Sequence, residues 1–251
     1  MGGIPAGPGK FGIVERPGPE NVTGTGILFF TSMSQSQSVV WNGIELELMA
    51  ECAIHWRQEE TLFLADPHFG KTATFREAGI PVPEQTTRDD CERMAELIVK
   101  TKSRRLIFLG DFFHSRVGKT VSVRDSLLLW RGHFPEVEMH LIRGNHDLSA
   151  GDPWTELSID CHSDPWTFRG LECRHSPVGQ SPHFYLAGHV HPGFTLKGRG
   201  RNSIRAACFH LTHSRIVLPA FGSFTGLSTV RPELGDRIFM TNRKEIVEAH
   251  F

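Results

Sequence analysis

Five short blocks of aspartate, asparagine and histidine occur along this sequence, and most of them directly follow an apolar run. The runs span residues 61–65, 105–109, 137–142 and 185–187, and each has the length of a buried strand. Because ligands bind at the carboxyl ends of strands in open α/β sheets, we expect these blocks to meet at one edge of a sheet. The blocks are Asp66-Pro67-His68, Gly110-Asp111-Phe112-Phe113-His114, Gly144-Asn145-His146-Asp147, His175 and Gly188-His189-Val190-His191.

The rest of the chain alternates between strand and helix patterns. Residues 44–48 alternate apolar and polar side chains, and Pro83 precedes an amphipathic stretch that is acidic at its start. Such alternation predicts one α/β domain with sheets at the centre and helices outside. Further strands are expected at 50–55, 207–211, 216–218 and 237–240, and helices at 84–102 and 121–130.

The first stretch of the chain differs in composition from the remainder. Glycine and proline crowd the first 26 positions, and Ser-Gln repeats follow Met33. We therefore expect residues 1–36 to be a disordered or non-native extension, with Met33 as the natural start, and residues 37–251 to form the functional domain.

The charge of the chain limits how it can bind nucleic acid. A net charge of −1 argues against binding through a global electrostatic field, so any contact must be local. The basic clusters near the polar blocks can be solvated turns or phosphate contacts. They comprise Lys102, Arg104 and Arg105, then Arg116, Lys119 and Arg124, and finally Lys197, Arg199, Arg201 and Arg205.

Other sequence features argue against two further classes of protein. There is no run of about 18 apolar residues and no pattern of a secretory signal, so we expect a cytoplasmic protein without a membrane span. The five cysteines form no Cys-x-x-Cys pair and are interpreted as reduced thiols, which excludes a disulfide framework or a zinc-thiolate site.

The oxygen and imidazole groups of the five blocks suit two adjacent divalent ions. Asp111 is predicted to be the carboxylate that bridges the two ions. Manganese, iron and zinc all fit such ligands. His183 lies near the fourth block, but we prefer His175 because it follows an expected strand near Leu171. One ion is assigned to Asp66, His68 and His191, and the other to Asn145, His175 and His189.

Water shared by two divalent ions loses a proton near neutral pH and yields a hydroxide that can attack phosphorus. His146 is left over from coordination and is the predicted general acid for the leaving alkoxide. Asp147 either orients His146 or caps a turn or helix. His114 is predicted to contact phosphate or to donate to a ligand. Arg143 can contact phosphate or form a surface ion pair.

The ordered blocks resemble the signature of the calcineurin-like metallophosphoesterase superfamily from Asp66 to His191. That resemblance implies a dinuclear manganese, iron or zinc centre in a β-sandwich of two mixed sheets flanked by helices. One departure is Ser176 after His175, where many members have glycine or a second histidine.

Three further stretches are similar to the bacterial ligase-associated DNA damage response endonuclease family. They are Leu64–Lys71, Phe75–Pro83 and Leu218–Gly226. The similarity implies a manganese-dependent phosphodiesterase and DNA nuclease that is encoded beside a helicase and a ligase. Lys71, within the first stretch, is a further candidate phosphate contact.

Three functions stay open from the sequence. The first is a DNA endonuclease that acts in repair on single-stranded or structured DNA. The second is a small-molecule or cyclic-nucleotide phosphodiesterase or phosphomonoesterase. The third is a scaffold that has lost catalysis, and the complete ligand set together with His146 argues against it.

Overall fold

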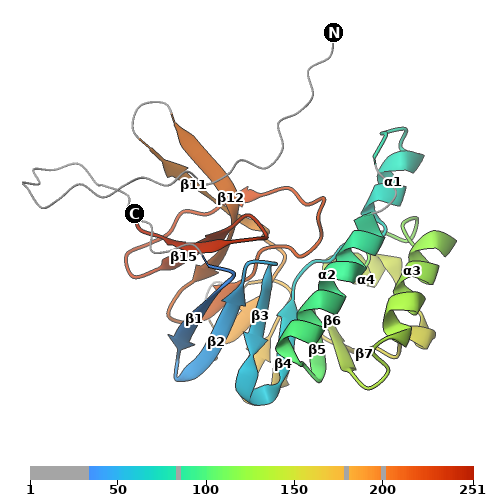
Figure 1. The fold of residues 1–251 in the computed structure, drawn as a ribbon, viewed down its shortest axis with the longest axis horizontal. Helices are drawn as coiled ribbons and strands as arrows, with labels where there is room; N and C mark the ends of the chain where they lie inside the picture. The colour runs from blue at the N-terminus through green and yellow to red at the C-terminus, as the bar shows by residue number, and fades with distance from the viewer. Residues whose placement is uncertain (1–33, 83–85, 178–180, 199–201) are drawn as a thin grey trace, which may run out of the picture.

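Two mixed β-sheets pack face to face, and helices cover the outer face of the first sheet (Figure 1). The computed structural model describes residues 34–82, 86–177, 181–198 and 202–251. The fold expected from the sequence, a sandwich of two mixed sheets with flanking helices, is therefore confirmed.

Within the described ranges the first sheet has seven strands in the order β1-β2-β3-β4-β5-β6-β7. The strands from β1 to β4 pair antiparallel, and those from β4 to β7 pair parallel. Parallel neighbours need crossover connections, which α2 and α3 provide. The strands are β1 (Ser36–Trp41), β2 (Ile44–Met49), β3 (Ala53–Trp56), β4 (Thr61–Leu64), β5 (Arg105–Leu109), β6 (Glu138–Ile142) and β7 (Asp160–His162).

The second sheet follows the order β14-β11-β12-β13-β10-β9-β8, and β15 and β16 extend it from β12. Its strands are β8 (Trp166–Phe168), β9 (Leu171–Cys173), β10 (Tyr185–Ala187), β11 (Pro192–Lys197), β12 (Ser203–Leu211), β13 (Arg215–Val217), β14 (Ser228–Thr229), β15 (Arg237–Thr241) and β16 (Ile246–Ala249).

Alternation along the strands builds two separate cores. In β5, Ile107 and Leu109 face the second sheet, whereas Leu106 and Phe108 pack against the helices. Each layer of the domain thus buries an apolar face. The helices are α1 (Lys71–Glu77), α2 (Thr86–Thr101), α3 (Val121–Gly132) and α4 (Asn145–Ala150), with short 3-10 turns η1 (Arg57–Glu59) and η2 (Thr155–Leu157).

The boundaries differ from expectation at two places. Ser36 opens β1 opposite Met49, and Ser34 pairs with Ile246, so these residues join the domain before the expected boundary at 37. Residues 1–33 of the expected extension lie outside the described residues, as do Pro83 and the first two residues, Glu84 and Gln85, of the helix predicted at 84–102. No helix in the described part of the chain is long and apolar enough to cross a membrane.

Strand ends from both sheets converge on one edge of the sandwich. Asp66 and Asp111 each follow their strands, β4 and β5, by two residues, and His175 and His189 follow β9 and β10 at the same interval. An isolated bridge pairs Ala65, just after β4, with Ala220, in the segment that follows β13. Side chains from four strand ends are therefore brought into a common region, as the sequence predicted.

Candidate metal centre

Three groups of possible ligand atoms form at this edge, and the ligand atoms of each group lie within 4.8 Å of one another. Two of the groups contain predicted metal ligands only: Asp66, His68 and His191 in the first, and Asp111, His175 and His189 in the second. The third group combines His68 with His114 and His146. The first two groups contain six of the seven metal ligands predicted from the sequence, divided largely as expected.

Asp111 lies between the two groups. Its Oδ1 is 3.5 Å from His175 Nε2, and its Oδ2 is 3.9 Å from His68 Nε2. The side chain is 3% exposed, so neither oxygen is freely hydrated. A carboxylate that presents one oxygen to each group has the arrangement needed to bridge two cations.

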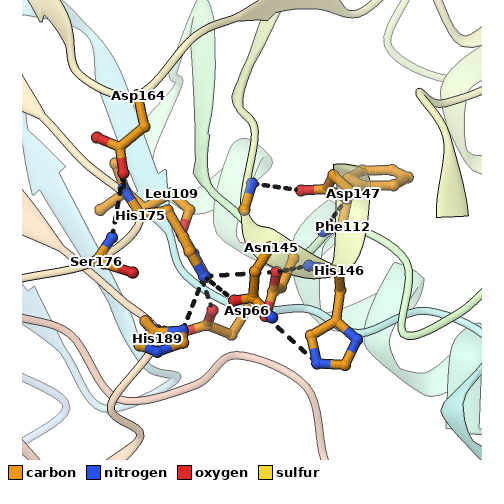
Figure 2. Close-up of polar contacts among 12 residues, drawn as sticks. Asp66, Leu109, Phe112, Asn145, His146, Asp147, Asp164, His175, Ser176 and His189 are labelled. Carbon is orange, nitrogen blue, oxygen red and sulfur yellow. Dashed lines mark hydrogen bonds and ion pairs between the residues drawn. The ribbon is translucent and has the colours of Figure 1, made fainter. Parts of the chain in front are cut away.

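His175 is central to the second group. Its Nε2 is 2.9 Å from Asn145 Oδ1, the seventh predicted ligand, and 2.9 Å from His189 Nδ1 (Figure 2). Its Nδ1–H donates to the main-chain carbonyl of Leu109 at 3.2 Å. That bond leaves the Nε2 lone pair free to bind a metal. The alternative residue, His183, is exposed.

The buried carboxylate of Asp66 tests whether the residues fit a cation. Oδ2 accepts a hydrogen bond from the His189 main-chain N–H at 2.7 Å, but Oδ1 is buried with no hydrogen-bond partner among the described residues, and His175 Nδ1 lies 3.6 Å from it. Burial and the neighbouring charge of Asp111 raise the pKa of Asp66 well above its usual range. A divalent ion would supply the missing partner and restore the charged form.

His68 and His191 fit the same interpretation. Their Nε2 atoms face each other at 3.2 Å. Burial lowers the pKa of His68 to about 2 and that of His191 to about 4, so both rings are neutral at pH 7. Two neutral imidazoles directed at one point, beside a carboxylate, are a suitable donor set for a divalent metal.

Two glycines of the sequence blocks make this convergence possible. A Cβ on Gly144 would lie 2.2 Å from Asp111 Oδ1, and a Cβ on Gly110 would lie 2.0 Å from His175 Nδ1. Gly110 also has a φ of +86°, which glycine adopts without strain. Larger residues at either position would displace the side chain of a predicted metal ligand.

His146 points its Nε2 toward Asp111 Oδ2, at 3.9 Å. Its Nδ1–H donates to the main-chain carbonyl of His114 at 2.5 Å, which holds the ring in one orientation. The side chain is 35% exposed, so a substrate can reach it. The orienting group is a main-chain oxygen, for which a sequence pattern gives no signal.

The predicted role of Asp147 as the orienting partner of His146 is wrong. Its carboxylate accepts hydrogen bonds from the main-chain N–H groups of Gly144 and Phe112, both at 2.9 Å, and a longer one from Phe113 at 3.4 Å (Figure 2). Asp147 thus caps the start of α4, because its third helical position lets it reach back to Gly144. The alternative prediction, that Asp147 caps a turn or helix, is therefore correct.

We expect Asp147→Ala to destabilise the domain rather than to remove proton transfer. A buried donor left without an acceptor costs about 1–3 kcal/mol, so losing this cap should lower the free energy of unfolding by about 3 kcal/mol. Urea denaturation measures this, with the exposed Asp125→Ala on α3 as the control. A variant of unchanged stability that loses turnover only for poor leaving groups would restore the orienting role.

The three residues predicted to contact phosphate, His114, Lys71 and Arg143, lie in different surroundings. His114 stacks on His146 with ring centroids 5.0 Å apart, and Lys71 is half-buried at the start of α1. Burial lowers the pKa of Lys71, and the Asp66 and Asp111 carboxylates oppose that shift, so its charge acts on the centre. Arg143 instead forms a two-pronged ion pair with Asp152 at 2.6 and 2.7 Å. This ion pair is the alternative to a phosphate contact that the sequence left open for Arg143.

Sequence reasoning missed one positioning group. The Asp164 carboxylate accepts hydrogen bonds from the main-chain N–H groups of His175, at 3.2 Å, and Ser176, at 3.4 Å (Figure 2). It fixes the turn that presents His175, but an isolated aspartate eleven residues upstream carries no recognisable pattern.

Comparison with solved structures identifies the class of protein. The crystal structure of Pseudomonas putida nuclease MPE aligns with a TM-score of 0.73 and 35% sequence identity, over 83% of this chain and 98% of that one. A phosphoesterase from E. coli, Yfce, aligns with a TM-score of 0.35 and 12% identity over 72% of this chain and 86% of that one, which is too weak to support a conclusion. No family model and no curated protein matches the chain.

A sandwich that gathers carboxylates and imidazoles at its strand ends is the architecture of a metal-dependent phosphoesterase, and the alignment agrees with it. The chain belongs to the metallophosphoesterase superfamily, in the family that includes Pseudomonas putida nuclease MPE. The superfamily predicted from the ordered blocks is confirmed.

Proposed function

We propose that this chain is a manganese-dependent DNA endonuclease of DNA repair that uses two divalent ions and His146 as general acid. The observation that carries the proposal is the position of Asp111 between two groups of ligand atoms. Two ions held about 3.5–4 Å apart by one carboxylate form the centre that many nucleases and phosphatases use.

Asp66, His68 and His191 would hold one ion, and Asn145, His175 and His189 the other, with Asp111 shared. Bound divalent ions would polarise the phosphoryl group and lower the pKa of a water molecule. An Asn ligand adds no negative charge where the phosphate must lie. With no thiolate among these residues, manganese suits the donor set.

His146 would donate a proton from Nε2 to the leaving alkoxide. The His114 carbonyl accepts a hydrogen bond from Nδ1–H, which fixes the orientation of the ring. Lys71 would offset phosphate charge from the start of α1. Both His146 and Lys71 lie close enough to Asp111 to interact with its carboxylate.

The solved relative from Pseudomonas putida is a nuclease, and its similarity to this chain supports DNA as the substrate. We propose single-stranded or structured DNA, because unpaired strands bend into a compact centre more easily than a duplex. The similarity of Leu218–Gly226 to the ligase-associated endonuclease family supports a functional association with a DNA ligase and a helicase.

The test is a survey of turnover after chelation and reloading with manganese, iron, zinc or magnesium. Substrates are a single-stranded oligonucleotide, a DNA hairpin, bis(p-nitrophenyl) phosphate and p-nitrophenyl phosphate. We expect manganese to restore internal cleavage of DNA, and hydrolysis of the diester above that of the monoester. Hydrolysis of the aryl substrates without DNA cleavage would favour a small-molecule phosphoesterase instead.

Lys71→Met should weaken DNA cleavage by removing one phosphate contact. We expect kcat/KM for the oligonucleotide to fall about tenfold, and the dependence of log kcat/KM on log salt to lose a slope of about one. Lys244→Met, on an exposed turn, is the matched control. An unchanged salt slope would show that Lys71 does not contact phosphate.

A further inference from the structure

The three basic clusters of the sequence lie in different parts of the fold. The first precedes or opens β5, so it lies at the amino end of a strand whose carboxyl end leads to Asp111. The third lies around the start of β12, where Arg205 already donates hydrogen bonds to the segment at 227–229. The second begins two residues after His114, which belongs to a group of ligand atoms at the metal centre. The second cluster is therefore the one that adjoins the centre.

The loop of the second cluster precedes α3 and is held against the metal centre at its start. The His114 carbonyl accepts a hydrogen bond from the ring of His146, and the His114 ring lies edge-on to that of His68, with centroids 5.4 Å apart. The Ser115 hydroxyl pairs with the Thr74 hydroxyl of α1 at 2.8 Å. The loop therefore keeps a set position relative to the metal ligands.

The next part of this loop packs on the start of α1. A Cβ on Gly70 would lie 2.1 Å from the Gly118 carbonyl oxygen, so the two backbones are in direct contact. Lys71 directly follows Gly70, and Arg116 lies two residues before Gly118 in a turn closed by a hydrogen bond from the Lys119 N–H to the Arg116 carbonyl at 3.1 Å. Arg116 is thus held in a turn on the same side of the metal centre as Lys71.

Arg116 is the cation of this cluster that stays available to a ligand. Its side chain is exposed, and its guanidinium forms no hydrogen bond or ion pair with any residue in the described ranges. Lys119, by contrast, donates to the Asp152 main-chain carbonyl at 2.8 Å, and Arg124 pairs with Glu156.

An exposed guanidinium beside a phosphoesterase centre suits a second phosphate of the same substrate. The planar fork of N–H donors matches phosphate oxygens, and the net charge of −1 means that a strand must be held by local contacts of this kind. A diester with a single phosphate can occupy the metal centre but has nothing to place on Arg116. A nucleic-acid strand carries a further phosphate at each step along its backbone.

We propose that Arg116 binds a phosphate next to the scissile one, so that the substrate strand leaves the metal centre along the loop that precedes α3. The inference rests on the proposed function and deepens it, because it gives the site a preference for a strand over a diester with one phosphate.

The test compares Arg116→Met with the wild-type protein on three diesters. The single-stranded oligonucleotide has many phosphates, whereas the dinucleoside monophosphate of thymidine and bis(p-nitrophenyl) phosphate have one each. We expect kcat/KM for the oligonucleotide to fall about tenfold, as for loss of a hydrogen bond to a charged group, and kcat/KM for the other two to stay unchanged. The dependence of log kcat/KM on log salt should lose a slope of about 0.7, the value for one phosphate of a single strand.

Two further variants serve as controls. Arg104→Met removes a side chain that is 78% exposed at the amino end of β5, and it should keep the wild-type rates and salt slope. Arg116→Lys keeps the charge but not the fork of donors, so it should keep the salt slope and recover part of the rate. An unchanged rate and slope in Arg116→Met, or an equal loss on the diesters with one phosphate, would overturn the inference.

A binding measurement separates this inference from the proposed nuclease activity. The probe is a labelled phosphorothioate oligonucleotide, which resists cleavage, and fluorescence anisotropy with the manganese-loaded protein gives its Kd. We expect this Kd to rise about tenfold in Arg116→Met. If it rises but the wild type cleaves no DNA, the nuclease proposal fails and the Arg116 contact stands. If DNA is cleaved while the variant binds and cleaves like the wild type, the Arg116 contact is wrong.

Discussion

Replacing Asp111 with alanine should lower kcat/KM by at least about 10³-fold, because metal ions contribute several kcal/mol to stabilising the transition state. Asp111 faces both groups of ligand atoms, so its loss should affect both ions together. Metal content after chelation and reloading, measured by mass spectrometry, should fall below the two ions per chain expected for the wild type.

Two companion variants distinguish loss of metal binding in Asp111→Ala from loss of the fold. Asp125→Ala removes an exposed carboxylate on α3 and should keep wild-type activity and metal content. Asp111→Asn keeps the shape and one oxygen but loses the charge, so it should fold and yet bind the second ion weakly. Full activity and two bound ions in Asp111→Ala would contradict the bridging role.

His146→Ala should retain both ions and lose turnover of poor leaving groups by about 10²-fold or more, the usual contribution of a general acid. The expected reason is that an alkoxide needs a proton from Nε2, whereas a p-nitrophenolate leaves without one. Rates with a DNA oligonucleotide and with bis(p-nitrophenyl) phosphate measure the difference.

The exposed His133→Ala at the end of α3 is the control for loss of an imidazole. Metal content must be measured alongside, because the His146 main-chain N–H donates to Asp111 Oδ1 at 2.9 Å and that bond should survive the substitution. An equal loss on both substrates would show that His146 positions the phosphate or a ligand and does not transfer the proton.

The strands that carry the site could be predicted because their signal is local. The runs 105–109 and 185–187 match β5 and β10 residue for residue, and each is a short apolar run ended by a polar block. The short helix α1 was not predicted, because seven residues with two buried side chains give no readable periodicity.

The roles of single polar side chains were harder to predict than their membership in the site. Asp147 stands next to His146 in the sequence, yet its carboxylate turns to the main chain of Gly144 and Phe112. Arg143 adjoins the same block, but its guanidinium forms an ion pair with Asp152. Neighbouring positions along a turn point in different directions, so adjacency in sequence says little about contact.

The sequence alone determined the class of chemistry, because the residue types at successive strand ends limit which ligands can meet and parallel strands bring their carboxyl ends to one edge. The tertiary structure decided which atoms face one another. The His114 carbonyl behind His146, the Asp164 carboxylate behind His175 and the contact of Gly118 with Gly70 all join segments distant in the chain. Such contacts depend on how the two sheets and the loops pack together, and no local pattern encodes that packing.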